Sequence, residues 1–168
     1  MASPSADVAT KVSTEAAERF TESYYPALKS NRETLSSYYI PPSAMPDGKP
    51  LPAIVFNGNV IPDPATFQNM FVKEMPPTHY EVQSFDCQVL NPNLLAGGPD
   101  ANTGGSGKNM TILLVVSGYV RIGEPREGPM RGFSDSIVLV PNPDKTAEKG
   151  RAPRSKWLIQ SQTSRFVV

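Results

Sequence analysis

The second half of the chain carries four long segments with the residue pattern of β-strands, and these limit the possible fold more than any other feature. They are residues 79–91, 109–122, 133–140 and 157–168. Each is rich in β-branched and aromatic residues, as strands that bury at least one face are. In the first of them the apolar alternation slips near Ser84, which predicts a β-bulge and therefore a bent sheet.

The first half of the chain carries helical patterns instead. Residues 5–28 predict the main helix, because apolar side chains recur every four positions along it. These side chains are Val8, Val12, Ala16, Phe20, Tyr24 and Leu28. Pro26 predicts a break or a kink near the end of this helix. Residues 31–38 predict a second, short helix with Asn31 as its N-cap, and the proline-rich residues 41–53 predict a loop.

Local turn signals place a small hairpin and a third helix between these parts. Residues 54–56 and 60–61 predict two short strands, because Asn57-Gly58 is the strongest two-residue hairpin signal. Asp63-Pro64 predicts the start of a helix, which Pro76-Pro77 ends. Helices followed by an antiparallel meander predict an α+β domain in which the helices pack on one face of a curved sheet.

Composition narrows the class of function. A length of 168 residues predicts one domain, spanning residues 1–168. Sixteen basic and sixteen acidic residues give a net charge of zero, which argues against nucleic-acid binding over the whole surface. The N-terminus lacks the basic end and apolar run of a signal peptide, and no window is apolar enough to span a membrane. We therefore expect an intracellular protein that does not contact membranes.

Catalytic and cofactor motifs are weak. Residues 104–109 are glycine-rich, but Asn102 and Asn109 stand where a phosphate-binding loop needs glycine and Ser/Thr. Cys87 and His79 are the only cysteine and histidine, too few for a zinc site or a catalytic triad. We expect Cys87 to be a small buried side chain and His79 to be a surface residue. The sequence predicts no catalytic residue, no metal site and no cofactor.

Two carboxylates within strands require a reason, since Asp is depleted there. Asp135 is expected to point outward into solvent. Asp86 follows the suspected bulge, and either a local hydrogen bond or a contact with a partner explains it.

The strand at 109–122 is apolar on both faces. Helices can cover only one face, so the side chains of Leu113, Val115 and Tyr119 predict a surface that a second polypeptide covers. Arg165 is the only ionisable side chain in the last strand. Its guanidinium suits a bidentate pair with a carboxylate, which a partner chain could supply.

Five segments, in order along the chain, resemble the small, nuclear-transport-factor-2-like subunit of the heterodimeric mRNA export receptor. They read A-A-E-R-F-T-E-S-Y-Y at 16–25, V-F-N-G-N at 55–59, F-D-C-Q at 85–88, S-G-Y-V at 117–120 and W-L-I-Q-S-Q-T-S-R-F at 157–166. The resemblance lapses at residues 41–53, 92–108 and 141–156, which look like loop insertions of the fungal form.

The resemblance implies a cone-shaped fold without enzyme activity or cofactor. It implies pairing through the sheet with the related domain of a large subunit, passage through the nuclear pore by contact of the complex with nucleoporin repeats, and shuttling between nucleus and cytoplasm. The family's interface arginine falls on Arg165 and its aspartate on Asp86. The expected interface residues are Arg165, Asp86, Tyr119, Val115, Leu113 and Phe166.

A basic loop offers a further site. The loop at 144–156 has five basic against two acidic residues, and either it is simply solvated or it contacts phosphates of RNA or preribosomal cargo. The basic residues are Lys145, Lys149, Arg151, Arg154 and Lys156. Two other functions remain open for the chain: an enzyme with a pocket inside the cone, as in dehydratases and isomerases, and a homodimeric transport factor.

Overall fold

The computed structural model describes residues 6–91, 109–124, 126–143 and 156–167. The elements in chain order are α1 (Ala6–Ser30), the 3-10 helix η1 (Arg32–Tyr38), β1 (Ser43–Ala44), β2 (Pro50–Leu51), β3 (Ala53–Phe56), β4 (Asn59–Ile61), α2 (Pro64–Asn69), the π-helix η2 (Met70–Glu74), β5 (Thr78–Asn91), β6 (Thr111–Ile122), β7 (Met130–Pro141) and β8 (Trp157–Val167). This order confirms the predicted α+β architecture.

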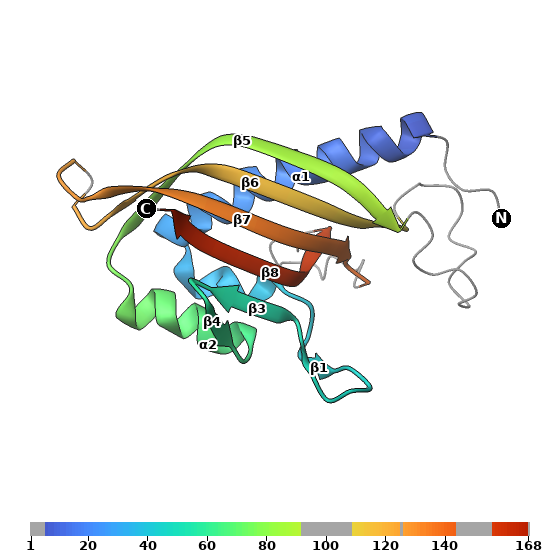
Figure 1. Ribbon diagram of the computed structural model, residues 1–168, viewed down its shortest axis with the longest axis horizontal. Helices are drawn as coiled ribbons and strands as arrows, with labels where there is room; N and C mark the ends of the chain where they lie inside the picture. Colours follow the sequence, from blue (N-terminus) through green and yellow to red (C-terminus); the bar gives the residue numbers. More distant parts are fainter. Residues whose placement is uncertain (1–5, 92–108, 125, 144–155, 168) are drawn as a thin grey trace, which may run out of the picture.

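A six-stranded sheet forms the frame, in the order β4-β3-β8-β7-β6-β5. The four long strands form the predicted antiparallel meander, but β3 pairs with β8 in parallel, so the sheet is mixed. Figure 1 views the sheet with its helices behind it: α1 runs behind β5 and β6, and α2 lies below, near β3 and β4. We call the side that carries the helices the inner face and the opposite side the outer face.

Helix α1 buries one stripe against the inner face. Phe20, Tyr24 and Leu28 of the predicted stripe are buried, whereas Val8, near the N-terminal end, is 41% exposed. The predicted break at Pro26 is wrong, because α1 continues through Pro26 to Ser30.

The predicted hairpin is confirmed. Asn57 and Gly58 both have positive φ, as the tight turn between β3 and β4 requires. Asn57 also fastens the hairpin to β8, because its backbone amide donates to the Ser164 carbonyl and its side chain accepts from the Phe166 amide. Residues 41–53 were expected to be a loop only, but β1 and β2 pair there around a turn at Gly48.

The third helix begins as predicted. Pro64 occupies its first turn, and the Asp63 carboxylate accepts a 2.7 Å hydrogen bond from the Thr66 amide. Phe67 and Phe71 on one face are fully buried, and they place η2 against the core. At the second helix, Asn31 makes no side-chain capping bond, and the helix is of the 3-10 type.

Strand β5 carries the predicted bulge. Its register with β6 shifts between Val82 and Ser84, so Gln83 has no partner residue on β6. The bulged backbone presses on Gly118, where an added Cβ would lie 2.0 Å from the Glu81 carbonyl oxygen. Glycine is therefore required at position 118 by the fold.

Candidate partner interface

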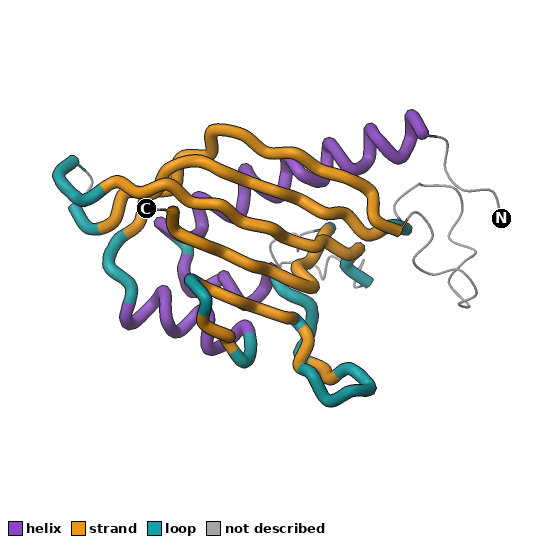
Figure 2. The backbone as a smooth tube through the Cα atoms, in the orientation of Figure 1, coloured by secondary structure: helices purple, strands orange, loops and turns teal. Residues whose placement is uncertain are grey.

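Figure 2 shows no helix on the outer face of the sheet. The strand register sets the rows in which the side chains of this face lie. The residues opposite one another on β6, β7 and β8 are Leu113–Val138–Ser161, Val115–Ser136–Thr163, Ser117–Ser134–Arg165 and Tyr119–Gly132–Val167. On the inner face of β6, Ile112, Leu114, Val116 and Val120 are fully buried. The helices thus cover only one face of this strand, as expected from the sequence.

The bare outer face is less apolar than the sequence indicated. Val115 and Tyr119 of β6 are 40% and 50% exposed, and Leu113 beside them is half-buried. The neighbouring strands, however, present mainly hydroxyls on this face: Ser134, Ser136, Ser161 and Thr163. The expectation from one strand did not extend to the whole sheet, because side chains of four strands share this face.

Arg165 lies near the C-terminal end of β8, on the outer face, and is exposed. Within the part of the chain that the structure describes, it has no hydrogen bond or ion pair, and the one ion pair there joins Lys49 to Asp47 at 3.6 Å. The row around Arg165 contains Ser117 and Ser134, neither of them acidic. The guanidinium is thus free to bind a carboxylate from outside the described chain.

Asp86 shares the outer face but is not the acid of Arg165. Three strand spacings separate β5 from β8, which is roughly 14 Å. The Asp86 carboxylate is exposed and accepts a 2.9 Å hydrogen bond from the Cys87 amide. This is the local hydrogen bond that the sequence offered as one explanation, and the exposed carboxylate keeps a second oxygen for a partner.

Phe166 has to be removed from the expected interface. Neighbours along a strand point to opposite faces, so its ring lies on the inner side and meets Phe56 at a centroid distance of 5.4 Å. The two residues of the R-F dipeptide therefore point to opposite faces of the sheet: Arg165 faces outward, whereas Phe166 packs against the core.

Asp135 corrects a second expectation, since it is 3% exposed rather than solvated. The Tyr25 hydroxyl donates to its carboxylate at 2.6 Å, and the Ser164 hydroxyl on β8 hydrogen-bonds to it as well. Burial outweighs these bonds and raises the pKa of Asp135 to about 6. The alternation did contain a signal, because Phe133, Asp135, Ile137 and Leu139 share one side of β7.

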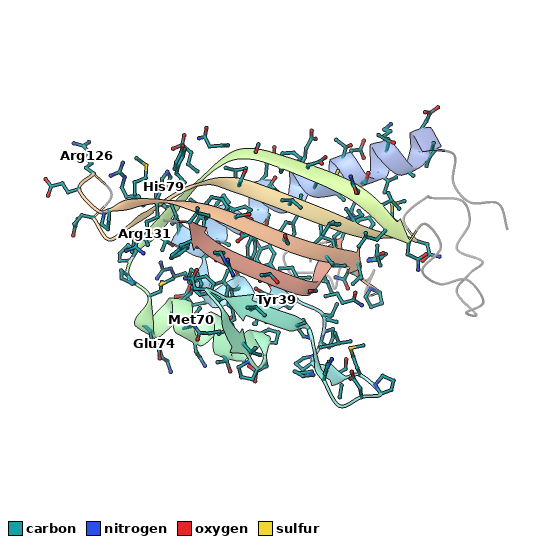
Figure 3. All side chains as sticks on the ribbon, in the orientation of Figure 1. Tyr39, Met70, Glu74, His79, Arg126 and Arg131 are labelled. Atoms are coloured by element: carbon teal, nitrogen blue, oxygen red, sulfur yellow. The ribbon has the colours of Figure 1, made fainter. Side chains whose placement is uncertain are left out.

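The interior beside Asp135 is a satisfied polar cluster. Gln162 is 2% exposed; it donates to the Tyr24 hydroxyl at 2.8 Å and accepts from the Tyr39 hydroxyl. Burial raises the pKa of Tyr24 and Tyr39 well above the ordinary tyrosine value. Tyr39 lies behind the sheet near β8 in Figure 3. Every buried side-chain nitrogen and oxygen in the described residues has a hydrogen-bond partner.

The remaining candidates carry little chemistry. Cys87 is half-buried beside the core, and His79 is exposed at the end of the molecule where Figure 3 labels Arg126 and Arg131. No group of three or more His, Cys, Asp or Glu in the described residues could hold a metal ion. No helix there is long and apolar enough to cross a membrane.

The basic loop falls almost wholly outside the described residues. The residues outside the described part of the chain include Lys145, Lys149, Arg151 and Arg154, as well as the expected loop at 92–108. Lys156 is exposed, and its carbonyl accepts a hydrogen bond from the Asn142 amide at the base of the loop. The expectation of an RNA or cargo contact here stays a prediction.

Sequence reasoning missed Arg32, which joins three elements. Its guanidinium donates to the carbonyls of Leu28, Phe71, Met75 and Pro76 and to the Thr78 hydroxyl, at 2.6–3.1 Å. It also lies over the Phe71 ring. No local pattern reveals these contacts, because the acceptors are up to 46 residues away in the chain.

No protein-family model and no curated protein matches the chain. Solved structures do match. A chain in the structure of a Sac3N peptide bound to Mex67:Mtr2 is 27% identical with a TM-score of 0.73, and the match covers 92% of this chain and 98% of that chain. A structure of Mtr2 is 28% identical with a TM-score of 0.71, over 91% and 98% of the two chains.

A third match is a chain in the structure of the Chaetomium thermophilum Mex67 NTF2-like domain complexed with Mtr2. It is 26% identical with a TM-score of 0.72, and covers 92% of this chain and 98% of that chain. A scytalone dehydratase from Novosphingobium aromaticivorans shares the fold alone, at 9% identity and a TM-score of 0.55 over 95% and 87% of the two chains. The resemblance seen in the sequence is thus confirmed: this chain is similar to Mtr2 over nearly its whole length and has the nuclear-transport-factor-2-like fold.

Proposed function

We propose that this chain is the non-catalytic small subunit of a heterodimeric mRNA export receptor, and that it pairs through its outer face with the NTF2-like domain of a Mex67-type large subunit. Mtr2 occurs with Mex67 in two of the matching structures. The single observation that carries the pairing mode is Arg165: an exposed cation on a helix-free sheet face, with no carboxylate partner among the described residues.

The energetics favour a carboxylate of the partner at this position. Arg165 makes no bond that pairing would have to break, and a bidentate carboxylate pair gives both strength and orientation. The surrounding hydroxyls of Ser117 and Ser134 are small, so a partner's side chain can reach the guanidinium. Removing one member of such a pair once it is buried typically costs about 3–5 kcal/mol.

The non-catalytic assignment is supported by the hydrogen bonds that already engage the buried polar groups on the inner face. A dehydratase or isomerase needs a pocket lined by titratable groups that reach a substrate. Here Asp135 is the one buried carboxylate of the described residues, and its oxygens already accept hydrogen bonds from Tyr25 and Ser164. Tyr24, Tyr39 and Gln162 bind one another in the same way.

Transport through the pore follows from membership in such a receptor. We infer that the complex works in the nucleus and at the nuclear pore, that it contacts nucleoporin repeats, and that it shuttles to the cytoplasm. The basic residues at 145–156 are the candidates for RNA or preribosomal cargo, since phosphate contacts require only exposed Lys and Arg.

The test is co-purification of the chain with the NTF2-like domain of its Mex67-type large subunit, followed by calorimetric titration. We expect one 1:1 species for the unchanged chain. Arg165→Asp should abolish pairing, and Arg165→Lys should weaken it, because the bidentate geometry is lost. Arg19→Asp, an equal charge change on the exposed side of α1, is the matched control and should bind normally.

Normal binding by Arg165→Asp would move the interface away from the outer face. Sedimentation of the chain alone decides the homodimer alternative: a tight dimer that Arg165→Asp disrupts would support self-pairing, and a monomer that dimerises only with the large subunit supports the proposal.

A further inference from the structure

Gly132 is the third residue of β7, and the fold around it gives no structural reason for glycine. Its φ is not positive, and an added Cβ would meet nothing nearer than the Val167 Cβ at 3.4 Å, an ordinary contact. At Gly118, by contrast, the fold excludes any side chain. Glycine within a strand costs about 0.5–1 kcal/mol relative to alanine, and one common reason to keep it is the close approach of a ligand or another chain.

The surroundings of Gly132 form a notch on the outer face. Tyr119 and Val167 lie directly opposite it on the two neighbouring strands, which places them roughly 10 Å apart with no side chain between them. Met130, two positions before Gly132 on β7, closes the hairpin side. Tyr119, Val167 and Met130 are 50%, 48% and 57% exposed, so they form a group of exposed large apolar side chains on this face.

The wall of the notch is held in place. Arg121 lies opposite Met130, donates to the Gly128 carbonyl at 3.0 Å and contacts the Met130 sulfur at 3.9 Å. On the other side, Arg165 lies in the next row of β8, two positions before Val167. Arg165 is thus the diagonal neighbour of Gly132 on the adjacent strand, at a distance of about 7–8 Å, and it borders the notch.

We propose that the notch over Gly132 receives one large apolar side chain of the large subunit's NTF2-like domain, from a strand that also carries the carboxylate for Arg165 two positions away. Two positions along a strand span about 7 Å on one face, which matches the spacing between the notch and Arg165. This inference rests on the proposed function, because it names the partner's chemistry at the same face.

The notch has the properties of an interface hot spot. Hot spots are well-packed pockets near the centre of an interface, filled by an aromatic or aliphatic side chain and kept dry by their surroundings. Tyr119 and Val167 supply apolar walls, and the Gly132 backbone supplies the floor. The neighbouring Arg165 pair would be shielded from water by the same side chain, which strengthens the pair.

The test measures binding to the NTF2-like domain of the Mex67-type large subunit by calorimetric titration. Gly132→Val fills the notch, and we expect it to weaken binding by about tenfold or more. It should leave the melting temperature of the free chain unchanged or higher, since valine suits a strand. Tyr119→Ala and Val167→Ala remove the walls from the exposed surface, and each should weaken binding by about three- to tenfold.

Val72→Ala on η2 is the matched control, because Val72 is 39% exposed and lies off the outer face. Unchanged binding by Gly132→Val, with Arg165→Asp still abolishing pairing, would overturn the notch and leave the proposed function intact. If Gly132→Val fails to fold, the two wall variants decide: unchanged binding by both overturns the proposal. Unchanged binding by the notch variants and by Arg165→Asp alike would overturn the outer face as the interface.

Discussion

The hydroxyl of Tyr25 donates a 2.6 Å hydrogen bond to the buried carboxylate of Asp135, and this bond joins α1 to β7 across 110 residues of chain. The neighbours of Asp135, Ser134 and Ser136, belong to the outer face. Adjacent residues of β7 therefore face opposite sides of the sheet: Asp135 faces the hydrogen-bonded polar cluster inside, and its neighbours face the surface proposed to bind a partner.

Asp135 should make the stability of the free chain depend on pH. Its pKa is about 6 in the folded chain and 3.8 for an unperturbed group, so the folded chain holds the proton more tightly. The free energy of unfolding should fall by about 3 kcal/mol in all as pH rises from about 3 to about 7, and about 2 kcal/mol of this fall should lie between pH 4.5 and 7.5. Urea unfolding at pH 4.5 and 7.5 measures the second figure.

Asp135→Asn is the comparison that isolates this group. Asparagine keeps the size and an oxygen that can accept from Tyr25, but it does not ionise. The variant should be more stable than the unchanged chain at pH 7.5, and this difference should shrink at pH 4.5. A difference that is the same at both pH values would show that Asp135 does not titrate in this range.

Tyr25→Phe should destabilise the chain by about 1–3 kcal/mol, because it removes a donor from a buried carboxylate. The loss should be larger at pH 7.5, where the carboxylate is charged, than at pH 4.5. Tyr119→Phe removes a hydroxyl from a half-exposed tyrosine and should change stability little. Equal losses at both pH values would mean that the hydroxyl acts only through packing.

Arg32 should be a larger contributor to stability than any other charged residue in the described chain. Arg32→Ala leaves the carbonyls of Phe71 and Met75 without this donor, and we expect a loss of about 3 kcal/mol or more. Arg32→Lys keeps the charge but not the fork of donors, and should recover only part of this. Arg19→Ala on the exposed side of α1 is the control, and a similar effect of both alanine variants would contradict the assignment.

Gly118 on β6 and Gly132 on β7 should respond in opposite ways to substitution by alanine. Gly118→Ala should destabilise by several kcal/mol or prevent folding, because the new Cβ would lie 2.0 Å from a backbone oxygen of the bulge. Gly132→Ala should be neutral or stabilising, since its nearest contact is 3.4 Å. Thermal unfolding of both variants checks this, and a destabilised Gly132→Ala would give Gly132 a structural role.

Much of the fold was predictable because its signals are local. Asn57-Gly58 sets a turn through its own φ angles. Asp63 caps a helix through the amide of Thr66, three residues further along the chain, and the slip near Ser84 marks a bulge within one strand. The outward positions of Val115, Tyr119 and Arg165 followed from strand alternation. The same alternation turns Phe166 to the inner side, so the two residues of the R-F dipeptide cannot share one interface.

Tertiary structure decided what depends on distant segments. The sequence placed Asp135 in a strand, but only the packing of α1 on the sheet supplied Tyr25 and made burial of that carboxylate tolerable. Arg32 acquired its role because α1, η2 and β5 meet around it, and Gly132 became a notch because Tyr119 and Val167 flank it from other strands. Neighbouring residues determine local features such as turns, helix caps and bulges, whereas burial and side-chain pairing depend on which segments the folded chain brings together.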